Sequence, residues 1–171
     1  DVVFAMSKVE MVLRITGAME RYLLALGDEG MLIRSQYEQL IGKTRDDQDL
    51  IIKDYVFEDV SKKNFKKKLS ALSDEELVDL SKIAKIMGFS GYNENLDKPT
   101  STRGYRLLSK IHKLPEGIIE NLIEHFGSFQ DILAASIEEL DEVDGIGEIR
   151  ATYIRNGLIK MKKLAVLDRQ I

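Results

Sequence analysis

The sequence predicts an all-α protein in which a helical bundle is followed by a tandem pair of helical hairpins. Apolar residues recur at helical spacing through most of the 171 residues, and no stretch alternates apolar and polar residues over a useful strand length. Capping boxes at Ser73 and Ser136 mark two helix starts. The chain has 12 Gly and only 2 Pro, which argues against a disordered or fibrous protein.

Residues 1–90 are expected to form the bundle. A long amphipathic helix is predicted over Asp1–Leu26, because its apolar residues keep helical spacing and Gly27 supplies a stop. The chain starts within this helix, so we expect it to be a fragment of a longer protein. The next predicted elements are a turn at Asp28-Glu29-Gly30 and helices over about Met31–Ile41, before Gly42, and Asp47–Phe57.

The densest basic run, Ser61–Lys68, has two interpretations. It is either a nucleic-acid patch or the solvated face of a helix, and Phe65 and Leu69 at helical spacing favour the helix. The capping box of Ser73 and Glu76 then predicts one helix that continues through Met87 and stops at Gly88.

Residues 91–103 are predicted to be a connecting loop, because Gly, Asn, Pro, Ser and Thr interrupt the helical rhythm there. Residues 104–171 are predicted to be the domain of two hairpins. Its expected helices run from Tyr105 to Ile111, from Glu116 to Phe126, from Phe129 to Ala134 after Ser128, from Ser136 through Leu140, and from Glu148 to about Leu167.

The segment Val143–Ala151 predicts two helices joined by a very tight turn. Gly145 can adopt φ > 0 without steric cost, Ile146 is expected to point back between the helices, and Gly147 allows a close approach from outside. The first amides of the next helix then face solvent at the positive end of its dipole, where phosphate binds well. This segment resembles the helix-hairpin-helix family, whose hairpins hold a nucleic-acid backbone through main-chain amides.

A second, degenerate copy of the hairpin precedes it. Ile111-His112-Lys113-Leu114-Pro115 aligns with Val143–Gly147, and the apolar residues of the helices that follow also match. One such hairpin cannot bury its apolar face alone, so two copies predict a compact tandem helix-hairpin-helix domain. Lys113 and Pro115 replace the glycines, which leaves open whether the backbone of this copy can hold phosphate; the Lys113 side chain is the more plausible contact there.

Charge restricts the kind of DNA binding that is expected. The net charge is −4, and residues after Thr100 carry ten Lys and Arg against eleven Asp and Glu. Binding must then rely on local amides and a few cations, so we expect it to be non-specific, modest and sensitive to salt. The candidate DNA-binding residues are Gly145, Ile146, Gly147, Glu148, Arg150, Lys113, Arg103, Arg106 and Lys110.

No catalytic or metal-binding residues are predicted. Cysteine is absent, which excludes disulfides and thiolate metal sites, and His112 and His125 are isolated from one another. Gly145-Ile146-Gly147 lies between helices, which is not the setting of a dinucleotide-binding loop. No apolar run approaches the length of a membrane span, and no signal peptide is recognisable. We expect a soluble, cytoplasmic protein without membrane contact.

Longer segments carry a more specific resemblance. They are Arg103–Gly127 (RGYRLLSKIHKLPEGIIENLIEHFG), Ile132–Gly147 (ILAASIEELDEVDGIG) and Leu167-Asp168-Arg169, with Glu20-Arg21-Tyr22 and Leu26–Gly30 inside the stretch Glu10–Leu40. Together they resemble the linker and C-terminal domains of the bacterial DNA integrity scanning family of diadenylate cyclases. The resemblance covers essentially the whole chain and only the last two of the family's three domains.

This resemblance implies a function in DNA damage sensing and repair. In the family, an N-terminal domain makes cyclic di-AMP from two ATP with Asp-Gly-Ala and Arg-His-Arg motifs and a divalent metal. Here the only Asp-Gly is Asp144-Gly145, followed by Ile146, so this chain is expected to be catalytically silent and to need no cofactor. ATP and the metal are expected only in the missing domain.

The resemblance also implies how the chain acts in its parent. The family forms octamers in which helical spines end in DNA-binding heads, and branched DNA such as Holliday junctions suppresses synthesis by the cyclase domains. Residues 1 to about 90 would form the spine and about 100–171 the head. Such a protein is expected in the bacterial cytoplasm, associated with the nucleoid.

The alternative is a protein–protein interaction module of a DNA repair or recombination complex. The near-neutral charge of residues 100–171 favours it, and the paired glycines of the hairpin do not. Salt distinguishes the two, because phosphate binding weakens steeply as salt rises while an apolar interface changes little.

Overall fold

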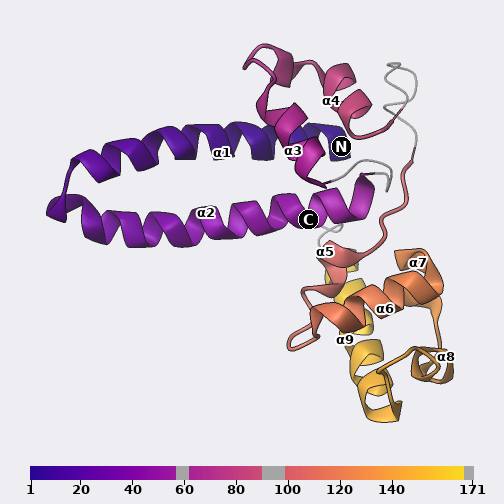
Figure 1. Ribbon diagram of the computed structural model, residues 1–171. Coiled ribbons are helices and arrows are strands. Elements are labelled where there is room, and N and C mark those ends of the chain that lie inside the picture. Colours follow the sequence, from indigo (N-terminus) through magenta and orange to yellow (C-terminus); the bar gives the residue numbers. More distant parts are fainter. Residues whose placement is uncertain (57–61, 90–98, 168–171) are drawn as a thin grey trace. The chain divides into compact units, whose positions relative to one another are not determined.

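The computed structural model describes residues 1–56, 62–89 and 99–167, and these form helices joined by turns, with no strand among them (Figure 1). The prediction of an all-α protein is confirmed. The chain divides into two compact units, residues 1–100 and 101–171. Each has a hydrophobic core of its own.

Two long antiparallel helices dominate the first unit, α1 (Val2–Ala25) and α2 (Asp28–Tyr55), which lie side by side (Figure 1). The predicted turn at residues 28–30 and the predicted break near Gly42 are wrong, because one helix covers both. Gly27, at φ +59°, makes the turn alone. Gly30 stays helical, and a Cβ there would lie 2.5 Å from the carbonyl oxygen of Leu23, so this glycine permits close packing of α2 on α1. The end predicted at Phe57 lies outside the described residues.

Short helices pack on the α1–α2 pair. The basic run forms α3 (Lys62–Ser70), which buries Phe65 and Leu69 completely while Lys63, Lys67 and Lys68 stay exposed. The solvated-face interpretation therefore describes this helix. The core that these helices share with α1 and α2 consists of Val3, Met6, Ile51, Ile52, Val56, Phe65, Leu69, Leu77, Ile83, Ala84 and Met87.

The single helix predicted after Ser73 is wrong. The Ser73–Glu76 capping box forms, with the Ser73 amide donating to Glu76 Oε2 at 2.8 Å and the Glu76 amide to Ser73 Oγ at 3.1 Å. Only one 3-10 turn, η1 (Glu76–Val78), follows it. Asp79 then leaves the helical region (φ −79°, ψ 95°) and caps a separate helix, α4 (Leu80–Ile86), by accepting from the Ser81 amide at 3.0 Å.

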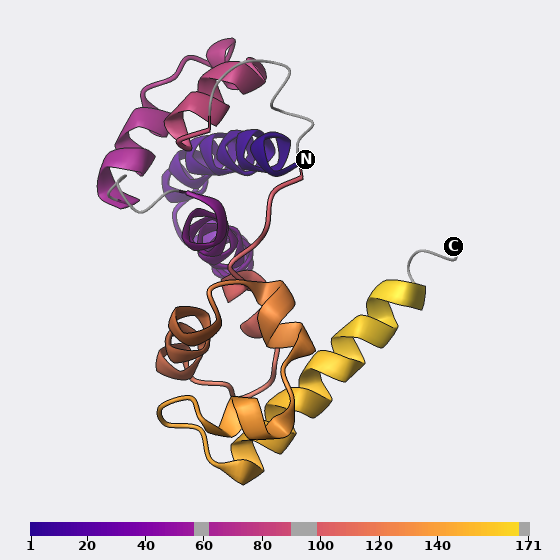
Figure 2. The same ribbon diagram turned by 90° about the vertical axis from the view of Figure 1, so that its right-hand side faces the viewer.

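Within the described residues 101–167, five helices share one hydrophobic core, and Figure 2 shows these helices from a second side. They are α5 (Tyr105–Leu108), α6 (Glu116–Phe126), α7 (Phe129–Ala134), α8 (Ile137–Asp141) and α9 (Glu148–Leu167). The prediction of a first helix reaching Ile111 is wrong by about one turn. After Leu108 the chain tightens, since Ile111 N–H bonds to the carbonyl of Leu108, three residues back, at 2.9 Å.

Local signals define most helix ends in this unit. Ser128 caps α7 by accepting from the Asp131 amide at 3.2 Å. Ser136 and Glu139 form the predicted capping box at the start of α8, with the Ser136 amide donating to Glu139 Oε2 at 2.7 Å. Gly127 ends α6 at φ +75°. These caps fix where each helix begins, so the short helices keep their places around the core.

The capping box of α8 gives a pH dependence that can be measured. Hydrogen bonds from the Ser136 backbone and then its side chain lower the pKa of Glu139 below its ordinary value of 4.5. A carboxylate with a lowered folded-state pKa stabilises the fold above its unfolded pKa, and the contribution disappears as pH falls through the folded pKa. The Glu139→Gln variant should therefore be less stable than the parent near neutral pH and converge with it below 4.5.

Urea unfolding of both proteins across this range measures the effect. Glu138→Gln removes the same charge from the same helix turn outside the capping box, so it should show a smaller pH-dependent difference. A difference between the parent and Glu139→Gln that stays constant from neutral to acid pH would contradict the prediction.

Candidate nucleic-acid interface

The turn between α8 and α9 is built as the sequence predicted. Gly145 has φ +75°, a conformation that reverses the chain at no steric cost to glycine. Ile146 follows with only 6% of its surface exposed, and its amide bonds to the carbonyl of Val143 at 2.9 Å. Gly147 is exposed and, because a Cβ there would meet nothing within 4 Å, its surroundings are open. Ile146 thus anchors the turn in the core, while Gly147 leaves its outer side without a side chain.

The start of α9 leaves backbone donors available. The first bond of this helix runs from the Ala151 amide to the carbonyl of Gly147 at 2.9 Å. The amides of Glu148, Ile149 and Arg150 precede that bond, so they have no acceptor within the helix and stand at its positive end. Three donors at the end of a 20-residue helix suit a phosphate oxygen.

The turn of the first hairpin has a similar backbone conformation to that of the second, although its sequence differs. Lys113 is the only residue other than glycine with positive φ among the described residues, at 59°, and it occupies the position that aligns with Gly145. Leu114 donates to the carbonyl of Ile111 at 3.2 Å, as Ile146 does to Val143. The turn that the sequence left in doubt is therefore retained, at a cost of about 1–2 kcal/mol for a left-handed lysine.

Each hairpin is bonded to the turn of the other. Asn121 Nδ2, on α6, donates to the carbonyl of Asp144 in the second turn at 2.9 Å, and Tyr153 Oη, on α9, donates to the carbonyl of His112 in the first turn. The two donors are equivalent, because Tyr153 lies 32 positions after Asn121. The two acceptors are equivalent as well, because Asp144 lies 32 positions after His112. Such an exchange is typical of two copies related by an approximate two-fold axis. It also fixes the separation of the two turns.

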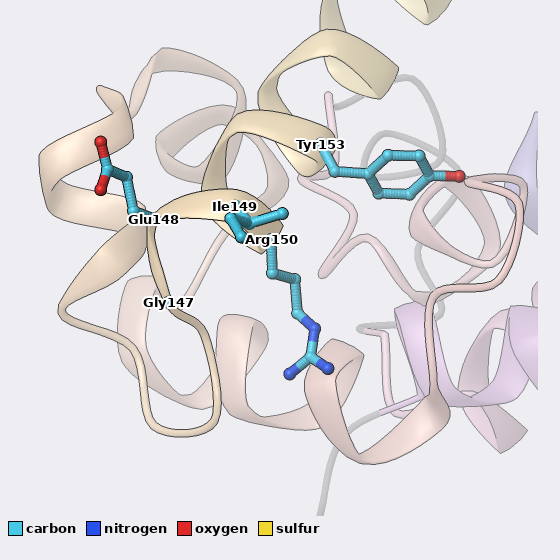
Figure 3. Close-up of a pocket in the computed structure, with 5 residues that line it drawn as sticks. All are labelled: Gly147, Glu148, Ile149, Arg150 and Tyr153. Atoms are coloured by element: carbon cyan, nitrogen blue, oxygen red, sulfur yellow. The ribbon is translucent and has the colours of Figure 1, made fainter.

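A shallow depression of about 680 Å³ opens beside the second turn, lined by Gly147, Glu148, Ile149, Arg150 and Tyr153 (Figure 3). Figure 3 shows the carboxylate of Glu148 pointing away from the guanidinium of Arg150. The carboxylate of Glu148 therefore does not pair with the guanidinium of Arg150 in the depression.

Arg150, which the sequence predicts as a DNA contact, lines this depression, and it has a partner that the sequence does not predict. The Arg150 guanidinium donates from Nη1 to the carbonyl of Gly145 and so holds the turn from outside. An arginine has five N–H donors, so the group can still contribute charge and hydrogen bonds to a ligand. Lys113 is exposed on the first turn, next to the carbonyl that Tyr153 reaches.

The other predicted cations lie away from the turns. Arg103 precedes Gly104, Arg106 belongs to α5 and Lys110 follows that helix, so all three lie along the approach to the first turn. Arg106 and Lys110 are exposed and Arg103 is partly buried. All three come before the first turn in the sequence, while Lys113 belongs to that turn and Arg150 to the start of α9.

Three residues at this surface were not predicted. Asn121 and Tyr153 could have been found from the alignment of the two hairpins, because equivalent positions carry a donor in both. Ile149 is 89% exposed at the second position of α9, an unusual place for a large apolar side chain. No sequence signal distinguishes it from a residue of the core.

Comparison with known proteins identifies the family. Residues 1–96 match the family described as the DisA bacterial checkpoint controller linker region, which is more than half of the chain. The chain belongs to the DisA family. The resemblance predicted from sequence is thereby confirmed.

Relatives extend the match to the hairpins. The chain is 58% identical over its whole length to DNA integrity scanning protein DisA of Clostridioides difficile strain 630, of which it covers 48%. It is 46% identical over 165 residues, 95% of this chain and 47% of the relative, to the protein of that name from Carboxydothermus hydrogenoformans. The protein of that name from Acidothermus cellulolyticus is 40% identical over the whole chain, which covers 48% of it. The chain therefore spans about half the length of the curated relatives it matches.

The described residues offer neither a group of metal ligands nor a helix that could span a membrane. Within residues 1–56, 62–89 and 99–167, no three His, Asp or Glu side chains are grouped so that they could hold a metal ion. No helix of these same segments is both long and apolar enough to cross a membrane.

The two glycines of the second turn should respond differently to alanine. Gly145→Ala should destabilise the chain by about 1–2 kcal/mol, because alanine must take the left-handed conformation. Its Cβ would also approach Ile118 Cδ1 at 3.0 Å, which a flexible side-chain end can accommodate. Gly147→Ala adds its Cβ in open space and should change the free energy of unfolding by less than about 0.5 kcal/mol.

Urea unfolding of the two variants beside the parent measures both values. Equal stabilities for Gly145→Ala and Gly147→Ala would show that the backbone of the turn does not require glycine at position 145.

Proposed function

We propose that residues 101–171 bind the DNA backbone without reading base sequence, and that they prefer branched DNA such as a Holliday junction. The observation that carries this proposal is the pair of similar turns held together by the reciprocal bonds of Asn121 and Tyr153. The second turn precedes a helix whose first amides are unpaired within the helix. Main-chain donors recognise phosphate, which is the same at every base pair, so sequence readout is not expected.

The two turns would contact phosphate by different means. At the second turn, the amides after Gly147 approach the phosphate, and Arg150 adds charge. At the first turn, Pro115 has no amide proton, so the side chain of Lys113 supplies the principal contact. Arg103, Arg106 and Lys110 would contribute a weaker, longer-range attraction. The near-neutral charge of the unit leaves affinity dependent on these few groups.

Preference for branched DNA follows from the fixed spacing of the turns. A rigid pair of contacts binds best where two phosphate backbones lie at a matching separation, because a mismatch would have to be offset by deforming the DNA. A four-way junction offers additional pairs of backbones at its crossover. The exposed Ile149 beside the second turn could contact unstacked bases there, which a regular duplex does not offer.

In the longer parent, DNA held by this unit would regulate cyclic di-AMP synthesis by an N-terminal cyclase domain. Residues 1–100 would act as the linker that carries the signal. ATP and a divalent metal belong to that domain in this proposal, and the chain itself is neither an enzyme nor dependent on a cofactor. The protein would act in the bacterial cytoplasm at the nucleoid, in the response to DNA damage.

The alternative is that the hairpins bind a protein of a repair or recombination complex. The excess of acidic residues over basic residues after Thr100 is compatible with it. Such an interface would use exposed apolar residues such as Ile149, and its affinity would change little with salt.

Gly147→Val tests the DNA-binding proposal. The branched side chain points into the space that a phosphate must occupy, and loss of one charge-assisted hydrogen bond should lower affinity about tenfold or more. Fluorescence anisotropy with a four-way junction and a matched linear duplex, each at low and moderate salt, measures binding. We expect the parent to favour the junction and to weaken as salt rises.

Gly42→Val is the matched control, since Gly42 also has open surroundings but lies in α2 of the other unit. It should leave DNA affinity unchanged, and circular dichroism should show nearly parental helix content for both variants. Undiminished binding by Gly147→Val would reject the assignment of the second turn. Binding that is insensitive to salt would favour a protein partner.

The proposal includes self-association, up to an octamer in the parent. Five exposed apolar residues, four in α1 and one at its C-cap, follow the alternating spacing of three and four that suits a helix–helix seam. They are Val12, Ile15, Met19, Tyr22 and Leu26, each between 44% and 77% exposed. An uncovered stripe of this kind is typical of a protein interface.

Charged substitutions on α1 test self-association. Ile15→Glu should shift the chain toward monomer in sedimentation velocity over a range of concentrations, because a buried carboxylate would be unpaired. Leu24→Glu, equally apolar and 54% exposed but off the stripe, should not. A chain that is monomeric at every concentration, or equal effects of both variants, would count against this interface.

A further inference from the structure

A groove in the first unit has no part in the function proposed above. It lies where α1, α2 and α3 meet and has a volume of about 610 Å³. Its lining includes Arg14 and Arg21 from α1, Arg45 from α2 and Lys66 from α3, and the one carboxylate among the lining residues is that of Glu10. This volume is in the range of pockets that hold small molecules.

The single carboxylate of the lining already has partners within the protein. Glu10 is 7% exposed, its Oε2 accepts from Gln48 Nε2 at 2.9 Å, and its Oε1 lies 3.4 Å from Arg14 Nε. Gln48 is itself only 4% exposed. A buried charge held by two donors is fixed in place and contributes little repulsion to an incoming anion.

Arg14 is also committed to the protein. Its Nη1 lies 2.9 Å from Asp74 Oδ1, and its Nη2 donates to the carbonyls of Leu69 at 3.1 Å and Ser70 at 3.4 Å. These carbonyls belong to the C-terminal end of α3, which carries partial negative charge. Arg14 therefore offsets the partial negative charge of these carbonyls, which would otherwise repel an anion. Its side chain forms part of the groove wall.

Arg21 and Arg45 are different, because both are exposed and neither makes a hydrogen bond or ion pair with the described part of the chain. They come from different helices and line the same groove. Lys66 also lines the groove, and its charge is paired with that of Asp49. Two unpaired arginines that line one cavity suit a phosphate ligand, since each guanidinium group can bind two oxygens at once.

A glycine keeps the groove open. Gly17 lies in the interior of α1, where glycine weakens a helix relative to alanine. Its φ is not positive, and a Cβ there would meet nothing within 4 Å, so neither the backbone nor packing inside the chain requires it. Gly17 lines the groove between Arg14 and Arg21, and its lack of a side chain leaves free space there.

We propose that this groove binds a small phosphorylated molecule, with Arg21 and Arg45 holding its phosphate groups. Inorganic phosphate would fill only part of the volume, so a molecule with two linked phosphates or a phosphate on an organic body fits better. The site lies entirely within residues 1–100, and it stands whether or not the hairpins bind DNA. A bound anion would join α1 to α2 and stiffen this junction.

Titration of the chain with inorganic pyrophosphate at constant ionic strength tests the site. Chemical shifts in 1H–15N spectra should change for the Gly17 amide, the Gln48 side-chain amide and their neighbours, and calorimetry should give a saturable affinity. Arg21→Gln and Arg45→Gln should each weaken binding about tenfold or more, the loss expected for a charge-assisted hydrogen bond.

Two control variants separate binding from folding. Arg34→Gln removes the same charge from α2 at a side chain that pairs with Glu38 and does not line the groove, so it should leave pyrophosphate affinity unchanged. Gly17→Leu fills the groove without changing charge and should abolish binding while thermal stability stays equal or rises.

Two outcomes would overturn the proposal. One is that the chemical-shift changes spread over surface lysines, and that the parent, Arg21→Gln and Arg45→Gln bind pyrophosphate with the same weak affinity. The other comes from a linear duplex used as competitor. If the duplex displaces pyrophosphate and loses affinity in these same two variants, the groove is a contact for a nucleic-acid backbone.

Discussion

One residue with a left-handed backbone reverses the chain in each hairpin of residues 101–171, and the rest of that unit depends on this reversal. Gly145 adopts it freely and Lys113 adopts it under strain. In both turns the next residue, Ile146 or Leu114, bonds back to a carbonyl three positions earlier and turns its side chain toward the core. The following helix then begins with its first amides directed outward. Without the reversal, neither the core contact nor the exposed helix start would exist.

The two hairpins are alike in backbone and different in chemistry. The reciprocal bonds from Asn121 and Tyr153 connect each turn to the other hairpin. Gly147 leaves the outer side of one turn without a side chain, while Lys113 places an exposed positive charge on the other turn. In the function that we propose, these two unlike turns would contact two phosphate backbones that are not equivalent, as in an irregular DNA structure.

Helix content and most helix ends follow from local signals in the sequence. Capping by Ser128 and Ser136 and the positive φ of Gly127 act within one turn of the chain, so they can be predicted without knowing what packs nearby. The same reasoning failed in the first unit. Local signals predict a turn at Gly30, yet this glycine permits close packing of α2 against the carbonyl of Leu23. Asp79 likewise breaks a helix whose apolar pattern is continuous.

The sequence by itself determined the all-α class, the paired hairpins and the exposed glycines of the second turn, because spacing and residue type are sufficient for each. Tertiary structure alone decided which side chains meet across the hairpins, that Arg150 bonds to its own turn, and that Arg21 and Arg45 line one groove. These depend on helices that lie far apart in the chain, whose packing arises from the summed burial of many side chains. A pattern read along one segment carries no information about which distant segment will lie beside it.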